Sequence, residues 1–162
     1  MTISEICDIL KSKLYKTGFE YGFVLNGIKY KPNMEHGFDY KYQQFVEQIY
    51  VVQKPEDTLN YKIGTCIDTV ILMSSLLDNL EVQYKIWLLD NKKKVHTILT
   101  FNAENRIVYL ELTPQSSKPW YGNEIIYSNE NELQNHYNNN GFDIIDITDK
   151  IVVGERPHFF NE

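Results

Sequence analysis

The stretch from Cys66 to Leu80 constrains the fold of this chain more than any other part of the sequence. Its apolar side chains fall on most faces of a helix drawn through it, and they are Ile67, Val70, Ile71, Met73, Leu76, Leu77 and Leu80. A helix that is apolar nearly all round is stable when it is buried. The sequence therefore predicts a central helix here, with the remaining elements packed around it.

The segments on either side of this helix show two different patterns. Apolar residues recur at helical spacing before it and near the C-terminus, whereas β-branched and aromatic runs separated by turn residues follow it directly. The predicted helices are Ile3–Tyr15, Asp39–Tyr50, a short turn from Pro55 and Asn129–Tyr137; the predicted strands are Val82–Leu89, Val95–Phe101, Arg106–Leu112 and Phe142–Ile147; residues 18–37 are predicted to be irregular or a hairpin. Helices followed by an antiparallel meander predict an α+β fold. Because no repeat or linker is visible, residues 1–162 are expected to form a single domain.

Charge and composition argue against several classes of function. The formal net charge is −6 and the pI is near 5.2, so we expect no partner among nucleic acids or anionic membranes. No stretch reaches the roughly 18 apolar residues of a membrane span, and residues 1–16 do not resemble a secretory signal. Two cysteines without a signal favour a reducing, cytoplasmic compartment, with export by a signal-less route left open.

The cysteines and histidines also argue against a metal centre. The spacing of the two cysteines and four histidines matches no set of metal ligands. Gly64 lacks the Lys-Ser/Thr pair that follows the glycine of a phosphate-binding loop. We therefore expect neither a metal nor a cofactor.

Cys66 lies at the start of the predicted central helix, two residues after Gly64. A helix N-terminus stabilises a thiolate through its dipole and its unpaired N–H groups. A glycine just before it would let the chain bend sharply and leave room for a substrate. These features indicate a nucleophile. The alternative is a small buried residue, which is common for free cysteine and is our interpretation of Cys7 on the apolar face of the first helix.

A nucleophilic cysteine needs a base and a group that orients the base. The four histidines are His36, His96, His136 and His158. Only His96 lies within a predicted strand, which holds a side chain more firmly than a loop does. If its strand pairs with the next one through a turn at residues 102–105, His96 lies directly opposite Glu111. The sequence then predicts a Cys66–His96–Glu111 triad, and the alternative is an exposed cross-strand pair.

Three short motifs, in order along the chain, resemble the transglutaminase-like superfamily of papain-type cysteine enzymes. They are Gly64-Thr65-Cys66-Ile67-Asp68, the strand around His96, and Glu111-Leu112-Thr113, and the similar region runs from about Pro55 to Pro114. In that family, Gly-x-Cys-x-Asp opens the core helix, and successive strands carry the histidine and an acid followed by x-Thr. The resemblance implies a papain-like core, in which a buried central helix packs on an antiparallel sheet. It also implies that Cys66, His96 and Glu111 are catalytic.

The chain departs from this family pattern at three places. The acid is Glu111, where aspartate is commoner. Thr97-Ile98 follows the histidine instead of a small residue and tryptophan, and Glu81 stands where many members have a glycine at the helix end. These departures bear on the type of reaction more than on the fold.

Three further residues are assigned to shaping the site. Asp68 brings a negative charge to the first helical turn, which favours a helix N-terminus, and the resemblance implies that Asp68 and Gly64 shape the motif. The backbone N–H of Cys66 is the natural first donor to an oxyanion. Gln53 is our candidate for the second donor.

We therefore expect a cysteine-dependent enzyme that transfers acyl groups from amide bonds of a protein or peptide substrate. Hydrolysis, as in a peptidase or amidase, is favoured over transglutamination because no second substrate-binding module is visible. Deamidation is a further option. Two alternatives remain open. One is a binding or assembly domain that keeps the fold without catalysis, and the other is an arylamine acetyltransferase-like enzyme with a similar triad.

Overall fold

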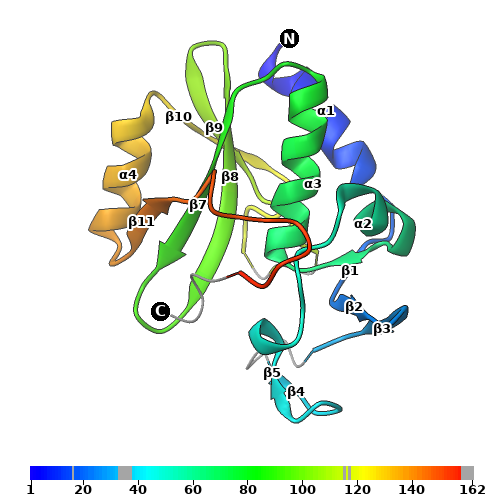
Figure 1. Cartoon of the computed structure of the whole chain (residues 1–162). Helices are drawn as coiled ribbons and strands as arrows, with labels where there is room; N and C mark the ends of the chain where they lie inside the picture. Colours follow the sequence, from blue (N-terminus) through cyan, green and yellow to red (C-terminus); the bar gives the residue numbers. More distant parts are fainter. Residues whose placement is uncertain (16, 33–37, 115, 117, 158–162) are drawn as a thin grey trace.

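Helix α3 (Cys66–Asn79) lies at the centre of the molecule against one face of an antiparallel sheet (Figure 1). The computed structural model describes every residue except 16, 33–37, 115, 117 and 158–162. The five strands of the sheet follow the order β10 (Glu124–Tyr127), β9 (Arg106–Leu110), β8 (Val95–Ala103), β7 (Tyr84–Asp90) and β11 (Asp143–Asp146). The predicted α+β class is confirmed.

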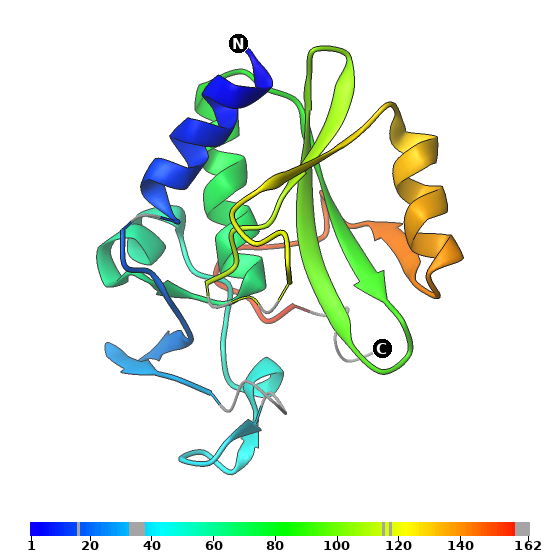
Figure 2. The same ribbon diagram turned by 180° about the vertical axis from the view of Figure 1, so that it is seen from behind.

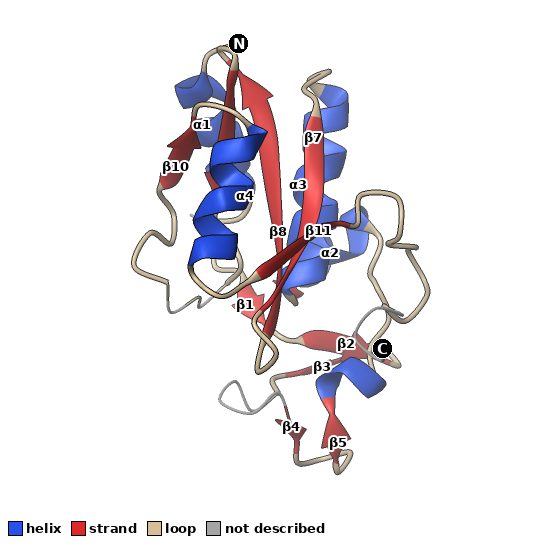
Figure 3. Cartoon of the chain, turned by 90° about the vertical axis from the view of Figure 1, so that its left-hand side faces the viewer, coloured by secondary structure: helices blue, strands red, loops and turns tan. Residues whose placement is uncertain are grey.

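The two faces of this sheet bury separate clusters of apolar side chains. α1 (Ile3–Lys13) and α3 cover one face, and α4 (Glu130–Asn139) lies against the other, as Figures 2 and 3 show. Side chains alternate along β7, so Ile86 packs toward α3 while its neighbour Trp87 packs toward α4. α3 is therefore enclosed by the sheet on one side and by α1 on another.

Both ends of α3 are fixed by local hydrogen bonds. At its start Thr65 is the N-cap and forms a capping box with Asp68. At its end the N–H groups of Glu81 and Val82 donate to carbonyls of the last helical turn in the Schellman pattern. Glu81 accordingly has a φ of 58°, a left-handed conformation that glycine adopts most readily.

The chain before α3 forms a layer of short elements near the start of that helix (Figure 1). They are β1 (Glu20–Tyr21), β2 (Phe23–Leu25), β3 (Ile28–Tyr30), β4 (Phe38–Asp39), β5 (Gln44–Phe45), the 3₁₀ turn η1 (Val46–Gln48), α2 (Pro55–Tyr61) and β6 (Ile63–Gly64). β1 pairs in parallel with β6, whereas β2–β3 and β4–β5 are antiparallel pairs. Phe23, Val46, Tyr50 and Val52 pack here around Ile67, in the first turn of α3. This layer therefore borders Cys66.

The helix predicted from Asp39 to Tyr50 is wrong. The Asp39 carboxylate accepts the N–H of Lys41 at 2.8 Å, a local turn that competes with helix formation. Gln43 is left-handed, with a φ of 54°, which a regular helix does not accommodate. The segment forms the strand pair β4–β5 and the turn η1 in place of the helix. Val46, Ile49 and Tyr50 pack in the cluster beneath α3.

The other predicted elements form with small differences at their ends. The hairpin expected within residues 18–37 is β2–β3, and residues 33–37 lie outside the described part of the chain. β10 was not predicted, because its four residues carry little pattern of their own and become a strand by pairing with β9. Tertiary pairing thus decided what the local sequence left open.

Replacing Glu81 with glycine should stabilise the protein. A left-handed conformation costs an L-residue about 1–2 kcal/mol, so Glu81→Gly should raise the free energy of unfolding by about 1 kcal/mol in urea denaturation. Glu81→Ala is the matched control, since it removes the same side chain but keeps Cβ. It should stay within about 0.5 kcal/mol of wild type. Equal stability of the two variants would contradict the prediction.

Candidate active site

Cys66 occupies the first position of α3 and is partly exposed. The other cysteine, Cys7, lies on the buried face of α1 with 2% of its surface exposed. Burial and the nearby charge of Glu124 raise the pKa of Cys7 to about 11. Cys66 is therefore the accessible thiol, and Cys7 is a core residue.

His96 and Glu111 are in direct contact. Nε2 of His96 lies 2.6 Å from Oε1 of Glu111. The Glu111 side chain is 3% exposed and that of His96 is 21% exposed. The Ser116 hydroxyl donates to the same carboxylate oxygen at 3.4 Å, and the N–H of Gly122 donates to the Glu111 carbonyl at 2.9 Å. The acid is therefore buried and fixed, and the histidine is the more accessible member of the pair.

This contact arises from a strand register different from the predicted one. β8 and β9 pair Ala103 with Arg106 around a two-residue turn at Glu104-Asn105, and both turn residues have positive φ, as a type I′ turn requires. The pairing is therefore two residues away from the expected register. A shift of two keeps every side chain on its face of the sheet, so Glu111 still reaches His96, diagonally rather than directly across.

His96 also interacts with Cys66. Burial by itself lowers the pKa of His96, but hydrogen bonds with Cys66 and Glu111, together with the charges of both groups, raise it to about 10. Because Glu111 contacts Nε2, Nδ1 is the ring nitrogen left for the thiol. The structure thus brings together the three residues that the sequence assigned to a triad.

Asp68 connects the start of α3 to the segment before it. Its Oδ1 accepts the backbone N–H of Gln53 at 2.8 Å, and its Oδ2 accepts the N–H and the hydroxyl of Thr65 at 3.0 and 3.3 Å. Burial raises the pKa of Asp68 to about 6, although these hydrogen bonds oppose the shift. At neutral pH the group is therefore a buried carboxylate that holds two backbone segments at the first turn of α3.

Gly64 and Gln53 both serve this arrangement around Asp68. A Cβ on Gly64 would lie 2.9 Å from Cβ of Asp68, so the glycine makes room for that side chain. Gly64 has no positive φ, so its backbone conformation does not require glycine. The Gln53 amide donates to the Ile63 carbonyl at 2.9 Å and to the Thr58 hydroxyl at 3.3 Å. Both amide hydrogens are engaged, so Gln53 offers no free side-chain donor to an oxyanion.

Tyr50 is a neighbour of Cys66 that the sequence did not single out. Its side chain is 3% exposed and belongs to the cluster beneath the first turn of α3. Burial above all, and then the charge of Cys66, raise the pKa of Tyr50 well above its ordinary value, while a hydrogen bond with Thr65 lowers it. The hydroxyl therefore lies at the N-terminus of α3. Apolar spacing indicated that this segment is buried, but no sequence signal indicated this contact.

The remaining histidines lie elsewhere or outside the described residues. His136 is on α4, with Nδ1 3.1 Å from the Tyr127 hydroxyl, and α4 and α3 lie on opposite faces of the sheet (Figure 3). His36 and His158 fall in the parts of the chain that the structure does not describe. The structure therefore offers His96 as the base for Cys66.

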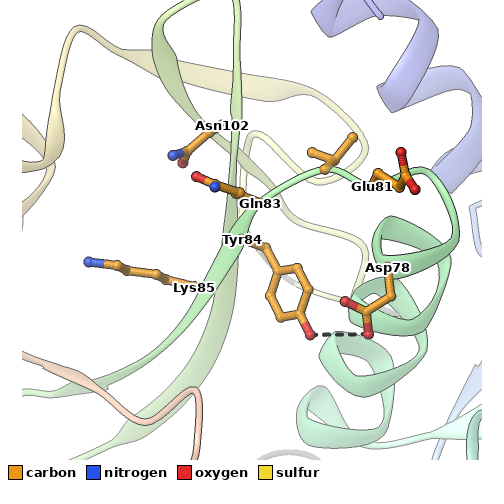
Figure 4. Close-up of a pocket in the computed structure, with 7 residues that line it drawn as sticks. Asp78, Glu81, Gln83, Tyr84, Lys85 and Asn102 are labelled. Atoms are coloured by element: carbon orange, nitrogen blue, oxygen red, sulfur yellow. Dashed lines mark hydrogen bonds between the residues drawn. The ribbon is translucent and has the colours of Figure 1, made fainter.

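A pocket at the other end of α3 is a poor candidate for the site (Figure 4). Its lining residues are Asp78, Glu81, Val82, Gln83, Tyr84, Lys85 and Asn102. The Tyr84 hydroxyl donates to Asp78 across it at 3.3 Å, but the lining holds neither a cysteine nor a histidine.

Among the described residues, no cluster of potential metal ligands is found. In the same part of the chain, no helix is long and apolar enough to cross a membrane.

Comparisons with protein-family models, with curated proteins and with solved structures find no match. The chemistry of the site is therefore inferred from its geometry. A thiol at a helix N-terminus, an imidazole in contact with it and a buried carboxylate behind the imidazole are suited to nucleophilic attack on a carbonyl group.

The raised pKa of His96 predicts a specific pH dependence of stability. A histidine titrates near pH 6.5 in an unfolded chain, whereas in the fold the pKa of His96 is about 10. The protonated ring therefore contributes stability that is fully present below about pH 6.5 and is lost as the pH rises toward 10. In urea titrations, the free energy of unfolding of wild type should therefore fall relative to that of His96→Gln as the pH rises across this range. A difference independent of pH would contradict the assignment.

Proposed function

We propose that this chain is a cysteine-dependent acyl-transfer enzyme that acts on amide bonds. Cys66 is the nucleophile, His96 is the acid–base group and Glu111 orients the imidazole. The observation that carries the proposal is the position of the His96 ring, which contacts Glu111 at 2.6 Å through Nε2 and lies near enough to Cys66 for the thiol to raise the pKa of His96. A nucleophile, a base and an orienting group in mutual contact are what nucleophilic catalysis requires.

The arrangement of elements supports a transglutaminase-like, papain-like core. In that reading, α3 presents the nucleophile at its N-terminus, and the neighbouring antiparallel strands supply the base and the acid. β8 carries His96, and Glu111 follows β9 directly. The order and the elements agree with the resemblance that the three sequence motifs suggested.

In the proposed reaction the Cys66 thiolate attacks the amide carbonyl carbon and forms a C–S bond. His96 gives its proton to the amine nitrogen as the C–N bond breaks, which releases the amine and leaves a thioester. The neutral imidazole then takes a proton from water as the water oxygen attacks the thioester carbonyl. The C–S bond breaks, a carboxylic acid leaves, and thiolate and imidazolium are restored. Glu111 remains ionised throughout and stabilises the imidazolium.

Water is the acceptor that we favour, which makes the reaction that of a peptidase or amidase on a protein or peptide substrate. An amine in place of water would give transglutamination, and attack by water on a glutamine amide would give deamidation. A non-catalytic assembly domain is the weaker proposal, because a domain that only assembles has no need of a thiol, an imidazole and a buried carboxylate gathered at one place.

The oxyanion of the tetrahedral intermediate needs two donors. The backbone N–H of Cys66 at the first position of α3 supplies one. We assign the second to the Tyr50 hydroxyl in place of Gln53, whose amide hydrogens are bound by Ile63 and Thr58. Tyr50 is buried in the cluster against which Cys66 packs.

The two cysteines should differ sharply in reactivity. Iodoacetamide should alkylate Cys66 already near pH 6, because an imidazolium and a helix N-terminus stabilise its thiolate. Cys7 should remain unmodified in the folded protein, since burial raises its pKa to about 11. Mass spectrometry of the labelled peptides distinguishes the two sites, with Cys66→Ser as the control. Equal labelling of both thiols, rising only above neutral pH, would refute the nucleophile assignment.

Substitution of Glu111 should separate its charge from its shape. Glu111→Gln keeps the shape but loses the charge-assisted hydrogen bond to His96, so turnover should fall about ten- to a hundredfold. Glu111→Asp keeps the charge with one methylene less and should retain more activity than Glu111→Gln. The measurement is turnover of an amide substrate or activity-based probe that wild type accepts, with folding checked by circular dichroism. Wild-type turnover in Glu111→Gln would mean that another group orients His96.

A further inference from the structure

Tyr109 and Trp120 bury polar atoms without satisfying them. The hydroxyl of Tyr109 and Nε1 of Trp120 are both inaccessible to solvent, and neither forms a hydrogen bond of ordinary geometry with a described group. Tyr109 is 0% exposed on β9, and its ring meets Trp120 edge to face with the centroids 6.4 Å apart. Buried donors normally have acceptors. These two donors therefore require an explanation beyond packing.

Glu111 is a charged neighbour of the Tyr109 hydroxyl. Tyr109 precedes Glu111 by two residues and points to the same face of the extended chain. Burial chiefly raises the pKa of Tyr109, and the charge of Glu111 adds to the shift, while Trp120 is the polar group that opposes it. The Glu111 carboxylate and the Trp120 indole are thus polar neighbours of the Tyr109 hydroxyl, although neither forms a hydrogen bond with it in the structure.

Among the described residues, none forms a hydrogen bond with Oε2 of Glu111. Both of the hydrogen bonds described for its carboxylate, from His96 and from Ser116, fall on Oε1. The side chain is 3% exposed, so water cannot solvate the charge freely, and a buried carboxylate is stabilised in its ionised form by additional donors.

We propose that Tyr109 is a positioning residue of the triad, which donates its hydroxyl hydrogen bond to Oε2 of Glu111 and accepts one from Nε1 of Trp120. The chain of contacts then runs from Trp120 through Tyr109, Glu111 and His96 to Cys66. This inference rests on the proposed function, since the task of Tyr109 is to keep Glu111 ionised and directed at His96 while the imidazolium forms. Aromatic packing alone would need no hydroxyl at residue 109.

Removal of the hydroxyl tests this inference. In Tyr109→Phe the ring and its contact with Trp120 are kept, but the carboxylate of Glu111 loses a donor and holds the His96 imidazolium less firmly, which weakens the support for the Cys66 thiolate. The rate of alkylation of Cys66 by iodoacetamide falls on the acid side of its pH profile, and this part of the profile, the acid limb, should move to higher pH. Near pH 6 the rate should be about tenfold lower than in wild type. Above about pH 9, where a free thiol of ordinary pKa ~8.5 is ionised without help, the rate should match wild type.

Two further variants define the source of the effect. Trp120→Phe should shift the acid limb in the same direction by less, and adding it to Tyr109→Phe should cause no further loss, because Trp120 acts through the hydroxyl. Tyr127→Phe is the matched control: Tyr127 is also a buried tyrosine of the cluster facing α4, but its hydroxyl meets His136 at 3.1 Å. It should leave the profile unchanged.

The outcomes distinguish this inference from the proposed function. A wild-type pH profile in Tyr109→Phe, with Glu111→Gln impaired, would overturn the role of Tyr109 and leave the triad standing. If wild-type Cys66 shows no reactivity near pH 6, or Glu111→Gln does not alter it, the proposed function fails and the inference fails with it. Should Tyr109→Phe not fold, Trp120→Phe decides: an unshifted acid limb in that variant would refute the chain of contacts.

Discussion

The carboxylate of Asp68 is the interaction on which the rest of the site depends. It is fully buried, and it binds the backbone of Gln53 and Thr65 at once. Removal from water disfavours its charge, as its raised pKa shows, but the hydrogen bonds offset part of that penalty. This carboxylate therefore fixes the segment that carries Tyr50 in position against the first turn of α3. The position of Cys66 follows from it.

Much of this could be predicted from the sequence because the decisive signals are local. Apolar residues on most faces of a helix predicted α3 and its burial, and the position of Thr65 and Asp68 at its start is the pattern of a capping box. Parity along a strand predicted that His96 and Glu111 share a face. That prediction holds although the predicted register was wrong by two residues, because only a shift by an odd number of residues would have placed the two side chains on opposite faces.

The remainder depended on contacts between distant segments, which leave no local pattern. The turn at Glu104-Asn105 could not be placed, because Glu104 adopts a left-handed conformation while its carboxylate accepts the N–H of Ile3 at 2.9 Å, at the start of α1. The partners of Gln53 and the burial of Tyr50 likewise follow from how the layer before α3 folds back beneath the helix. Tertiary structure decided these cases against local preference.

The register also gives a physical reason why a glutamate can fill the proposed role of the orienting acid. Hydrogen-bonded pairing of β8 and β9 ends at Thr100 and Tyr109, so His96 and Glu111 lie beyond the ladder and are offset along the strands. Diagonal neighbours in a sheet are about 7–8 Å apart, compared with about 5 Å for direct ones. The second methylene of Glu111 gives it additional reach, and its carboxylate contacts Nε2 of His96 at 2.6 Å. In this geometry the length of Glu111 compensates for its offset, so the proposed role of the acid does not require the aspartate that is commoner at this place in the family that the motifs resemble.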